Sequence, residues 1–249
     1  MAYLHAKRAV LDAGYEAEIA WQEDACRTPM TETRFLSEAA WVVLNSGMRE
    51  AVVRRIFPVI AFAFSNFISA RAAAASAVEG GREQALRAFR HEGKIDAIIA
   101  IVVHVRDAGL DEVERLLLLQ GTTYLQTLPY IGPVTSLHLA KNLGHDVAKP
   151  DRHLVRIARA CGYDNPQVLC SHLRDFLGEP VPVIDVVLWR YATLSANYID
   201  ELVREATPHP SWSHPFSEAE ETAARYRARH SANPNRTGTC PTGSLPAPS

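Results

Sequence analysis

The chain has 249 residues, 47% of them hydrophobic and 22% charged, and a formal net charge of −2. These values predict one globular unit or two closely packed lobes, and they argue against a protein that coats nucleic acid indiscriminately, because such proteins are usually basic. No apolar run is long enough to cross a membrane, and the first residues lack the apolar core of a signal peptide, so a cytoplasmic location is expected. The four cysteines are widely spaced without a CxxC pair, which indicates neither a zinc site nor a disulfide framework.

The first elements are predicted to be amphipathic helices. Residues 3–21 have helical periodicity and predict one helix, followed by a loop through Pro29. Thr31 or Thr33 is expected to cap a second helix that ends near residues 45–47. Gly47 suits the left-handed conformation that often ends a helix.

The middle of the chain predicts further helices with short connections. The segments with helical periodicity are 50–67, interrupted by Pro58, an alanine run at 72–75, then 82–90, 94–105 and a helix that starts near Gly109. No alternating strand pattern and no repeat of fixed period occur. The predicted fold class is therefore all-α.

The last third predicts a short helix over 167–177 and a long helix that opens at Pro182 and extends to about Ile199. From Thr207 onward prolines interrupt the chain. A charged helix is expected over 217–229, and the segment 231–249, rich in Pro, Gly, Ser and Thr, is expected to be disordered.

The sequence LPYIGP, residues 128–133, predicts a tight turn between two helical segments. Pro133 suits the first turn of a helix, where its missing N–H costs nothing. Gly132 lets the backbone approach a ligand closely, and the free N–H groups of a helix start point outward as anion donors. The turn therefore predicts a binding site for one backbone phosphate.

A second segment, KPDRHL, begins another helix, and its Asp151 follows Gly132 by 19 residues. Pro150 disfavours helical geometry in the residue before it, and Asp151 takes the N-cap position. Between residues 141 and 159 five basic residues stand against two acidic ones. Such a local excess suits a phosphate footprint, although an ordinary solvated face would look the same.

The two motifs together, LPxIGPxT and PDRHLxRIA joined by an amphipathic helix, resemble the HhH-GPD superfamily of DNA glycosylases, which includes endonuclease III and the 3-methyladenine and 8-oxoguanine glycosylases. The resemblance is sharp over residues 116–160 and loose over 35–206. It implies two helical lobes, double-stranded DNA with a damaged or modified base as partner, and base excision as the reaction, a step of DNA repair. In that family the aspartate after the hairpin is catalytic, and Asp151 matches it.

The resemblance also assigns binding residues. Those assigned to the DNA phosphate are Tyr130, Gly132, Val134, Thr135, Lys149 and Arg152. Those whose carbonyl groups would hold a structural monovalent cation, K⁺ or Na⁺, are Gln126, Leu128 and Ile131. Tyr130 stands where many relatives have glycine. No other cofactor is implied, because the chain lacks the four closely spaced cysteines with which some relatives hold an iron-sulfur cluster.

Residues around the extruded base are less constrained. Candidates for a wedge that fills the gap in the DNA are Asn45, Met48 and Arg49, on a segment that also reads as a plain helix end. Candidates for the base pocket are Glu38, Trp41, Tyr124, Trp189 and Tyr198. Aromatic residues at helical spacing belong more often to the core.

Bifunctional relatives, which also cut the sugar, carry a lysine where this chain has Val134. The expected activity is therefore that of a monofunctional glycosylase. The alternative of a glycosylase with lyase activity would need Lys141 or Lys149 as the amine. Each is more simply a solvated or phosphate-facing lysine.

Two further alternatives stay open: a DNA-binding protein that keeps the hairpin without catalysis, and an all-α protein-interaction domain. By the resemblance, residues 1–30 and 165–230 are expected to pack as one lobe, with 31–164 as a helical barrel that contains the hairpin at about 116–143. A monomer is expected.

Overall fold

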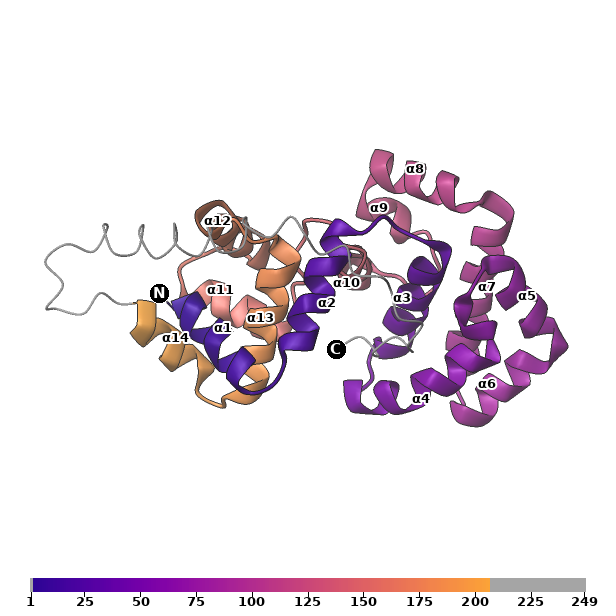
Figure 1. Cartoon of the computed structure of the whole chain (residues 1–249), viewed down its shortest axis with the longest axis horizontal. Helices are drawn as coiled ribbons and strands as arrows, with labels where there is room; N and C mark the ends of the chain where they lie inside the picture. Colours follow the sequence, from indigo (N-terminus) through magenta and orange to yellow (C-terminus); the bar gives the residue numbers. More distant parts are fainter. Residues whose placement is uncertain (1, 207–249) are drawn as a thin grey trace, which may run out of the picture. The chain divides into compact units, whose positions relative to one another are not determined.

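A computed structural model describes residues 2–206, and every regular element within them is a helix (Figure 1). The predicted all-α class is thereby confirmed for this part of the chain. None of the helices in residues 2–206 has the length and apolar character needed to cross a membrane. The helix expected over 217–229 and the segment 231–249 lie outside the described residues.

Contacts divide the chain into two compact units. Unit 1 contains residues 2–23 and 146–206, and unit 2 contains residues 24–145. The boundary expected from the sequence, between residues 164 and 165, differs from this division. The helix that follows Asp151 packs into unit 1, because its apolar residues Leu154 and Ile157 belong to the core of that unit.

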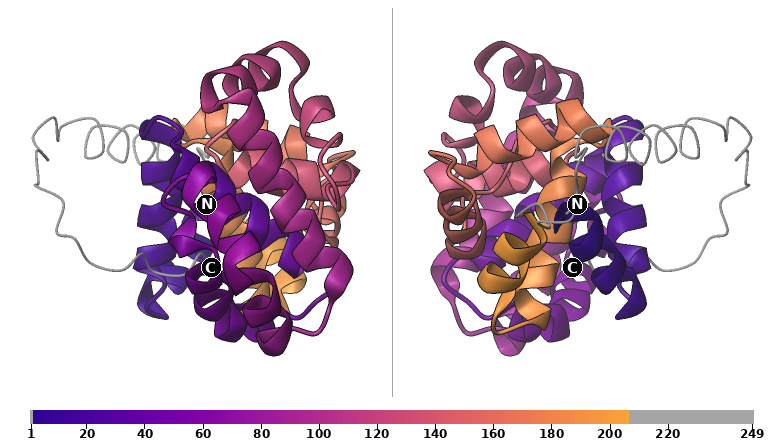
Figure 2. Two further views of the ribbon diagram at one scale, coloured as in Figure 1. Left: turned by 90° about the vertical axis from the view of Figure 1, so that its right-hand side faces the viewer. Right: turned by 90° about the vertical axis from the view of Figure 1, so that its left-hand side faces the viewer.

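Unit 1 is built from helices at both ends of the described chain. They are α1 (Ala2–Asp12), the first part of α2 (Glu16–Arg27), α11 (Arg152–Ala160), α12 (Pro166–Leu177), α13 (Val181–Leu194) and α14 (Tyr198–Ala206). Helix α1 packs against α13 and α14, and α11 packs against α12, α13 and α14 (Figure 1 and Figure 2). A buried ion pair between Lys7 and Glu179, at 2.8 Å, fixes α1 further.

Two helices expected in unit 1 are each interrupted. The single helix predicted over 3–21 is wrong, because Gly14 takes a φ of +86° and separates α1 from α2. The long helix that begins near Pro182 ends at Leu194, and α14 begins at Tyr198. The Ser195 hydroxyl accepts the Asn197 N–H at 3.1 Å, which stabilises the break.

Unit 2 contains the end of α2 and eight further α-helices. They are α3 (Glu32–Asn45), α4 (Glu50–Ala63), α5 (Ala70–Ser76), α6 (Arg82–Ala88), α7 (Glu92–Ala108), α8 (Leu110–Gln120), α9 (Thr122–Leu125) and α10 (Pro133–Asn142), with short irregular helical segments η1 (Ser65–Phe67) and η2 (Ala77–Gly81). Helix α3 packs against α4, α5, α7 and α10, and α7 packs against α3, α5, α6 and α8. Each of these two helices therefore packs against four other α-helices of unit 2.

The predicted ends of α3 are confirmed. Thr31 is its N-cap, and the side chain accepts the N–H of Arg34 at 3.2 Å. Thr33 is not the cap, because its hydroxyl donates to the carbonyl of Ile68. The helix ends at Asn45, and Gly47 has a φ of +70°.

Candidate functional site

The turn between α9 and α10 places Tyr130 in a conformation that favours glycine. The N–H of Ile131 donates to the carbonyl of Leu128 at 3.1 Å and closes a turn with Pro129 and Tyr130 at its centre. Tyr130 has a φ of +64°. For a residue with a Cβ this conformation costs about 1–2 kcal/mol, so other contacts must hold the turn.

Those contacts come from the tyrosine side chain. The Tyr130 ring meets the His91 ring edge to face, with the centroids 6.0 Å apart. Its hydroxyl lies over Gly93, where an added Cβ would come within 2.6 Å of the hydroxyl oxygen. The turn is thus fastened to the start of α7.

Gly132, in contrast, is not required by the fold. Its φ of −95° and ψ of −172° are open to any residue. An added Cβ would meet nothing closer than the Thr135 hydroxyl oxygen, at 3.9 Å. A glycine without a conformational or packing reason is available for the close approach of a ligand to the backbone.

The start of α10 leaves N–H groups available to a ligand. The N–H of Gly132 donates to the Thr135 hydroxyl at 2.6 Å, and the N–H of Ser136 donates to the Gly132 carbonyl at 2.8 Å. Within residues 2–206, the N–H groups of Tyr130, Val134 and Thr135 have no hydrogen-bond partner. Tyr130 is 45% and Val134 48% exposed. Donors at a helix start suit an anion, and two of the three expected phosphate donors are unpaired.

The carbonyl groups expected to hold a cation differ among themselves. The Leu128 carbonyl accepts a backbone hydrogen bond, whereas those of Gln126 and Ile131 accept none within the described residues. Nor do three or more His, Cys, Asp or Glu side chains gather anywhere in residues 2–206 as metal ligands. A monovalent cation on the turn therefore stays a prediction.

Asp151, in unit 1, is the N-cap of α11, as the sequence predicts. Its Oδ1 accepts the N–H groups of His153 and Leu154, both at 2.9 Å. Its Oδ2 has no hydrogen-bond partner among the described residues, and the residue is partly exposed. One oxygen therefore fixes the carboxylate while the other remains available.

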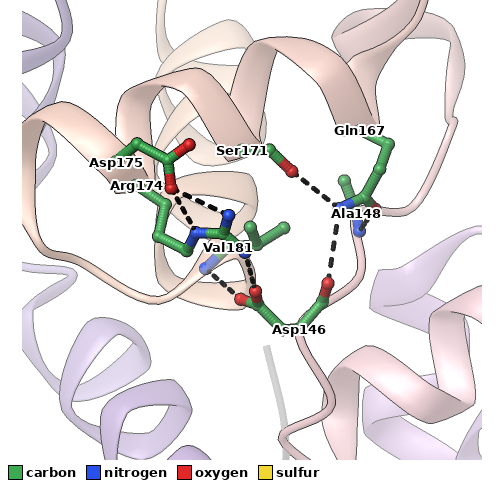
Figure 3. Close-up of polar contacts among 7 residues, drawn as sticks. All are labelled: Asp146, Ala148, Gln167, Ser171, Arg174, Asp175 and Val181. Carbon is green, nitrogen blue, oxygen red and sulfur yellow. Dashed lines mark hydrogen bonds and ion pairs between the residues drawn. The ribbon is translucent and has the colours of Figure 1, made fainter.

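The loop before Asp151 is held by two side chains of α12. Arg174 forms an ion pair with Asp146, whose carboxylate also accepts the N–H of Val181 at 3.0 Å (Figure 3). Gln167 accepts the N–H of Ala148 at 2.8 Å and donates to the Asp146 carbonyl at 3.3 Å. The loop is therefore bonded on both its side chains and its backbone.

A third contact lies closer to Asp151. The N–H of Lys149 donates to the carboxylate of Asp185 at 2.7 Å. Asp185 is 2% exposed and sits within the apolar helix α13. The sequence analysis missed Asp185 and Gln167. An acidic residue inside the apolar run 181–188 was the one signal that could have indicated the first.

His153 lies beside Asp151 and has a favoured tautomer. Its Nε2 accepts from Arg152 Nε at 3.2 Å, an arrangement that favours the tautomer with the proton on Nδ1, which lies 3.3 Å from the Tyr198 hydroxyl. Burial, together with Arg152 and Arg156, lowers the pKa of His153, while Asp151 opposes them. The remainder of the Arg152 side chain is exposed and can meet a phosphate.

The base-pocket candidates of unit 2 lie in its core. Trp41 is buried and meets the ring of Phe57 edge to face at 5.3 Å. Tyr124 is buried and its hydroxyl bonds His104 at 2.8 Å. Glu38 is buried too. These positions favour the core role that aromatic residues at helical spacing usually have.

Glu38 is a buried carboxyl with an unusual pKa. It accepts the side-chain N–H of Asn142 at 2.8 Å. Burial raises its pKa from 4.5 to about 7, although the Asn142 hydrogen bond and the charges of Arg34 and Lys141 act in the opposite direction. This carboxyl links α3 to the end of α10.

The remaining candidates lie at the surface of their units or close to it. The Asn45 side chain donates to the Trp41 carbonyl at 3.1 Å, Met48 is partly buried, and Arg49 is exposed at the N-cap of α4. In unit 1, Trp189 is partly buried and its ring lies 4.6 Å from the Arg190 guanidinium. Tyr198 is buried, and its hydroxyl contacts His153.

Lys141 is buried, whereas the sequence analysis expected it to face solvent or a phosphate. It is 7% exposed, because the last turn of α10 packs against α3. A buried amine is poorly placed to attack a sugar.

No protein-family model, curated protein or solved structure matches the chain.

Proposed function

We propose that the chain is a DNA glycosylase of the helix-hairpin-helix type, which hydrolyses the N-glycosidic bond of a damaged or modified base and leaves an abasic site. The observation that carries the proposal is Asp151. Its Oδ1 is fixed by two backbone N–H groups while its Oδ2 has no partner among residues 2–206. A carboxylate held rigidly with one free oxygen is what stabilisation of a cationic transition state requires.

The turn of unit 2 supplies the proposed grip on DNA. The unpaired N–H groups of Tyr130, Val134 and Thr135 are donors to one phosphate, and Gly132 permits its close approach. The Gly132 N–H joins them when the Thr135 hydroxyl turns away from it. The proposed hairpin consists of α9, the turn and α10.

Extrusion of the base costs a few kcal/mol, which phosphate contacts and a side chain in the vacated space offset. Asn45, Met48 and Arg49 are the proposed source of that side chain. Arg49 is exposed, and Met48 and Asn45 are partly exposed, so each can reach a ligand without unfolding of α3.

Bond cleavage follows from the electrostatics of Asp151. As the base leaves, positive charge develops on the sugar, and the Asp151 carboxylate stabilises it and orients the attacking water. The lowered pKa of the adjoining His153 favours its neutral form, which adds no competing positive charge. Val134 offers no amine and Lys141 is buried, whereas Lys149 is partly exposed. The proposal is therefore the monofunctional reaction, and strand breaks without alkali would assign the amine to Lys149.

The test is base release from a panel of duplexes, each with a single alkylated, oxidised, deaminated or hypermodified base. Strand breaks are scored before and after alkali for the wild type and Asp151→Asn. Asp164→Asn serves as the matched control, since Asp164 is an exposed aspartate of the same unit, between α11 and α12. A monofunctional glycosylase gives breaks only after alkali, and only the Asp151 variant loses them.

Other outcomes identify the alternatives. Salt-sensitive DNA binding without base release from any duplex would favour a non-catalytic binding protein. Breaks without alkali would favour a glycosylase with lyase activity. Absence of DNA binding at low salt would favour a protein-interaction domain.

A further inference from the structure

The first turn of α7 binds the end of α3 through a buried lysine. Lys94 Nζ donates to the carbonyl of Leu44 at 2.7 Å and to that of Ser46 at 2.6 Å. Lys94 is 3% exposed, and burial lowers its pKa. An ammonium group at a helix C-terminus satisfies carbonyls that have no intrahelical partner and interacts favourably with the helix dipole.

The adjacent residues of the same turn hold Tyr130. Gly93 leaves room for the tyrosine hydroxyl, and the His91 ring meets the tyrosine ring edge to face. His91 is itself fixed as the N-cap of α7, since its Nδ1 accepts the N–H of Lys94 at 3.3 Å. Its ring also stacks on Phe89, with the centroids 5.8 Å apart.

We propose that this turn, residues 91–94, sets the separation between the phosphate-binding turn and the loop 45–49, and that Lys94 is a positioning residue. The proposal rests on the function proposed above, in which the turn grips a phosphate and the loop fills the gap left by the extruded base. Gly93 and Lys94 are neighbours on one rigid helix. The phosphate-binding turn and the loop 45–49 are thus both held by the same backbone segment, residues 91–94.

The separation matters because, in the proposed function, the turn and the loop both contact the DNA around one extruded base. A misplacement of about 1 Å in a bound reactant can cost two orders of magnitude in rate. The two hydrogen bonds from Lys94 join the last residues of α3 to α7 immediately before Met48 and Arg49.

The experiment compares the affinity for two duplexes that differ at one position. One duplex is intact, and the other carries a tetrahydrofuran abasic analogue, which presents the gap that the loop is proposed to fill. Lys94→Met is expected to lower the preference for the abasic duplex by about tenfold and to leave the affinity for the intact duplex unchanged, because only the loop is released. Gly93→Ala, which displaces the Tyr130 hydroxyl, should instead weaken binding to both duplexes equally.

Ile98→Ala controls for loss of stability, since Ile98 is a buried apolar residue of the same helix. Each affinity is calculated from the concentration of folded protein in the sample of that variant. An unchanged preference in Lys94→Met, or one changed only as much as in Ile98→Ala, would overturn the positioning role. If Lys94→Met does not fold, Gly93→Ala decides, because a loss of affinity confined to the abasic duplex in that variant would show that residues 91–94 do not position the phosphate-binding turn. A wild type that binds neither duplex refutes the proposed function instead.

Discussion

The starts of α10 and α11 use the same backbone chemistry in opposite ways. At α10 the N–H groups of Val134 and Thr135 have no partner within residues 2–206. At α11 the corresponding groups of His153 and Leu154 are both taken by the carboxylate of Asp151. One helix start is open to an external anion, and the other holds an anion of its own. The comparison shows that Asp151 is a structural cap with a rigidly held carboxylate, the feature on which the proposed catalytic role rests.

The two starts also differ in how they are supported. The turn before α10 is fastened by aromatic and glycine contacts to residues 91 and 93 of unit 2. The loop before α11 is fastened by backbone N–H groups that donate to the side-chain oxygens of Gln167 and Asp185 in unit 1. The first arrangement leaves backbone donors free, and the second uses them up.

Asp151→Asn tests the largest consequence of this comparison. Asparagine caps a helix about as well as aspartate, so the free energy of unfolding should change by less than about 0.5 kcal/mol. Base release should fall by about a thousandfold, because the charge that stabilises the cationic sugar is lost. Single-turnover rates and denaturant unfolding measure the two effects. Equal losses of rate and stability would show that Asp151 is only a cap.

Glu38 shows what happens to a carboxyl without backbone donors. Its pKa is raised by burial from 4.5 to about 7, so between these values the folded state holds a proton that the unfolded state has released. Stability should therefore fall as pH rises through this window, by up to about 3 kcal/mol, and level off above it. The groups that face Glu38 and limit the shift are Arg34, Lys141 and Asn142.

The measurement is the free energy of unfolding against pH for the wild type and Glu38→Gln. Glutamine keeps the acceptor for Asn142 but does not titrate, so the difference between the two curves isolates this carboxyl. Glu83→Gln, at an exposed glutamate of the same unit, should run parallel to the wild type. Parallel curves for Glu38→Gln as well would contradict the raised pKa.

The sequence predicted local features of the fold well and tertiary features poorly. The cap at Thr31, the left-handed Gly47 after the end of α3 and the cap at Asp151 each depend on a few adjacent residues, and all three are confirmed. The break at Gly14 was missed, because a glycine within a periodic pattern does not reveal whether its φ is positive. Likewise, the residue types at Ser65 to Phe67 do not predict the positive φ values of these three residues.

The candidate site likewise shows that the sequence predicts contiguous features better than tertiary ones. The sequence located Asp151 and the turn, because their motifs are contiguous. Helical periodicity could not distinguish a residue that faces a pocket from one that faces the core, and Trp41 and Tyr124 proved to be buried. Neither Asp185 nor Lys94 could be assigned a partner, since each bonds backbone groups far away in the sequence.

Gly132→Ala tests whether the open helix start binds an anion. DNA affinity should fall by about tenfold, because a methyl group beside the free N–H groups obstructs a phosphate. Stability should stay within about 1 kcal/mol, since alanine is a poorer N-cap but also reduces the entropy of the unfolded chain. Gly162→Ala should lower the stability and leave the DNA affinity unchanged, because Gly162 has a φ of +79° and lies away from the turn in the sequence. Unchanged affinity in Gly132→Ala would remove the phosphate site from this turn.

The smallest effect concerns the backbone strain at Tyr130. Tyr130→Gly and Tyr130→Ala both lose the contacts with His91 and Gly93, so the difference between them reports on the backbone alone. With a φ of +64° at this position, the alanine variant should be less stable than the glycine variant by about 1 kcal/mol. The same pair at Val134, inside α10, should have the opposite order, because alanine is favoured over glycine within a helix. If alanine were the more stable at both positions, the turn would not hold Tyr130 in the left-handed conformation, and its N–H would not point outward with that of Val134.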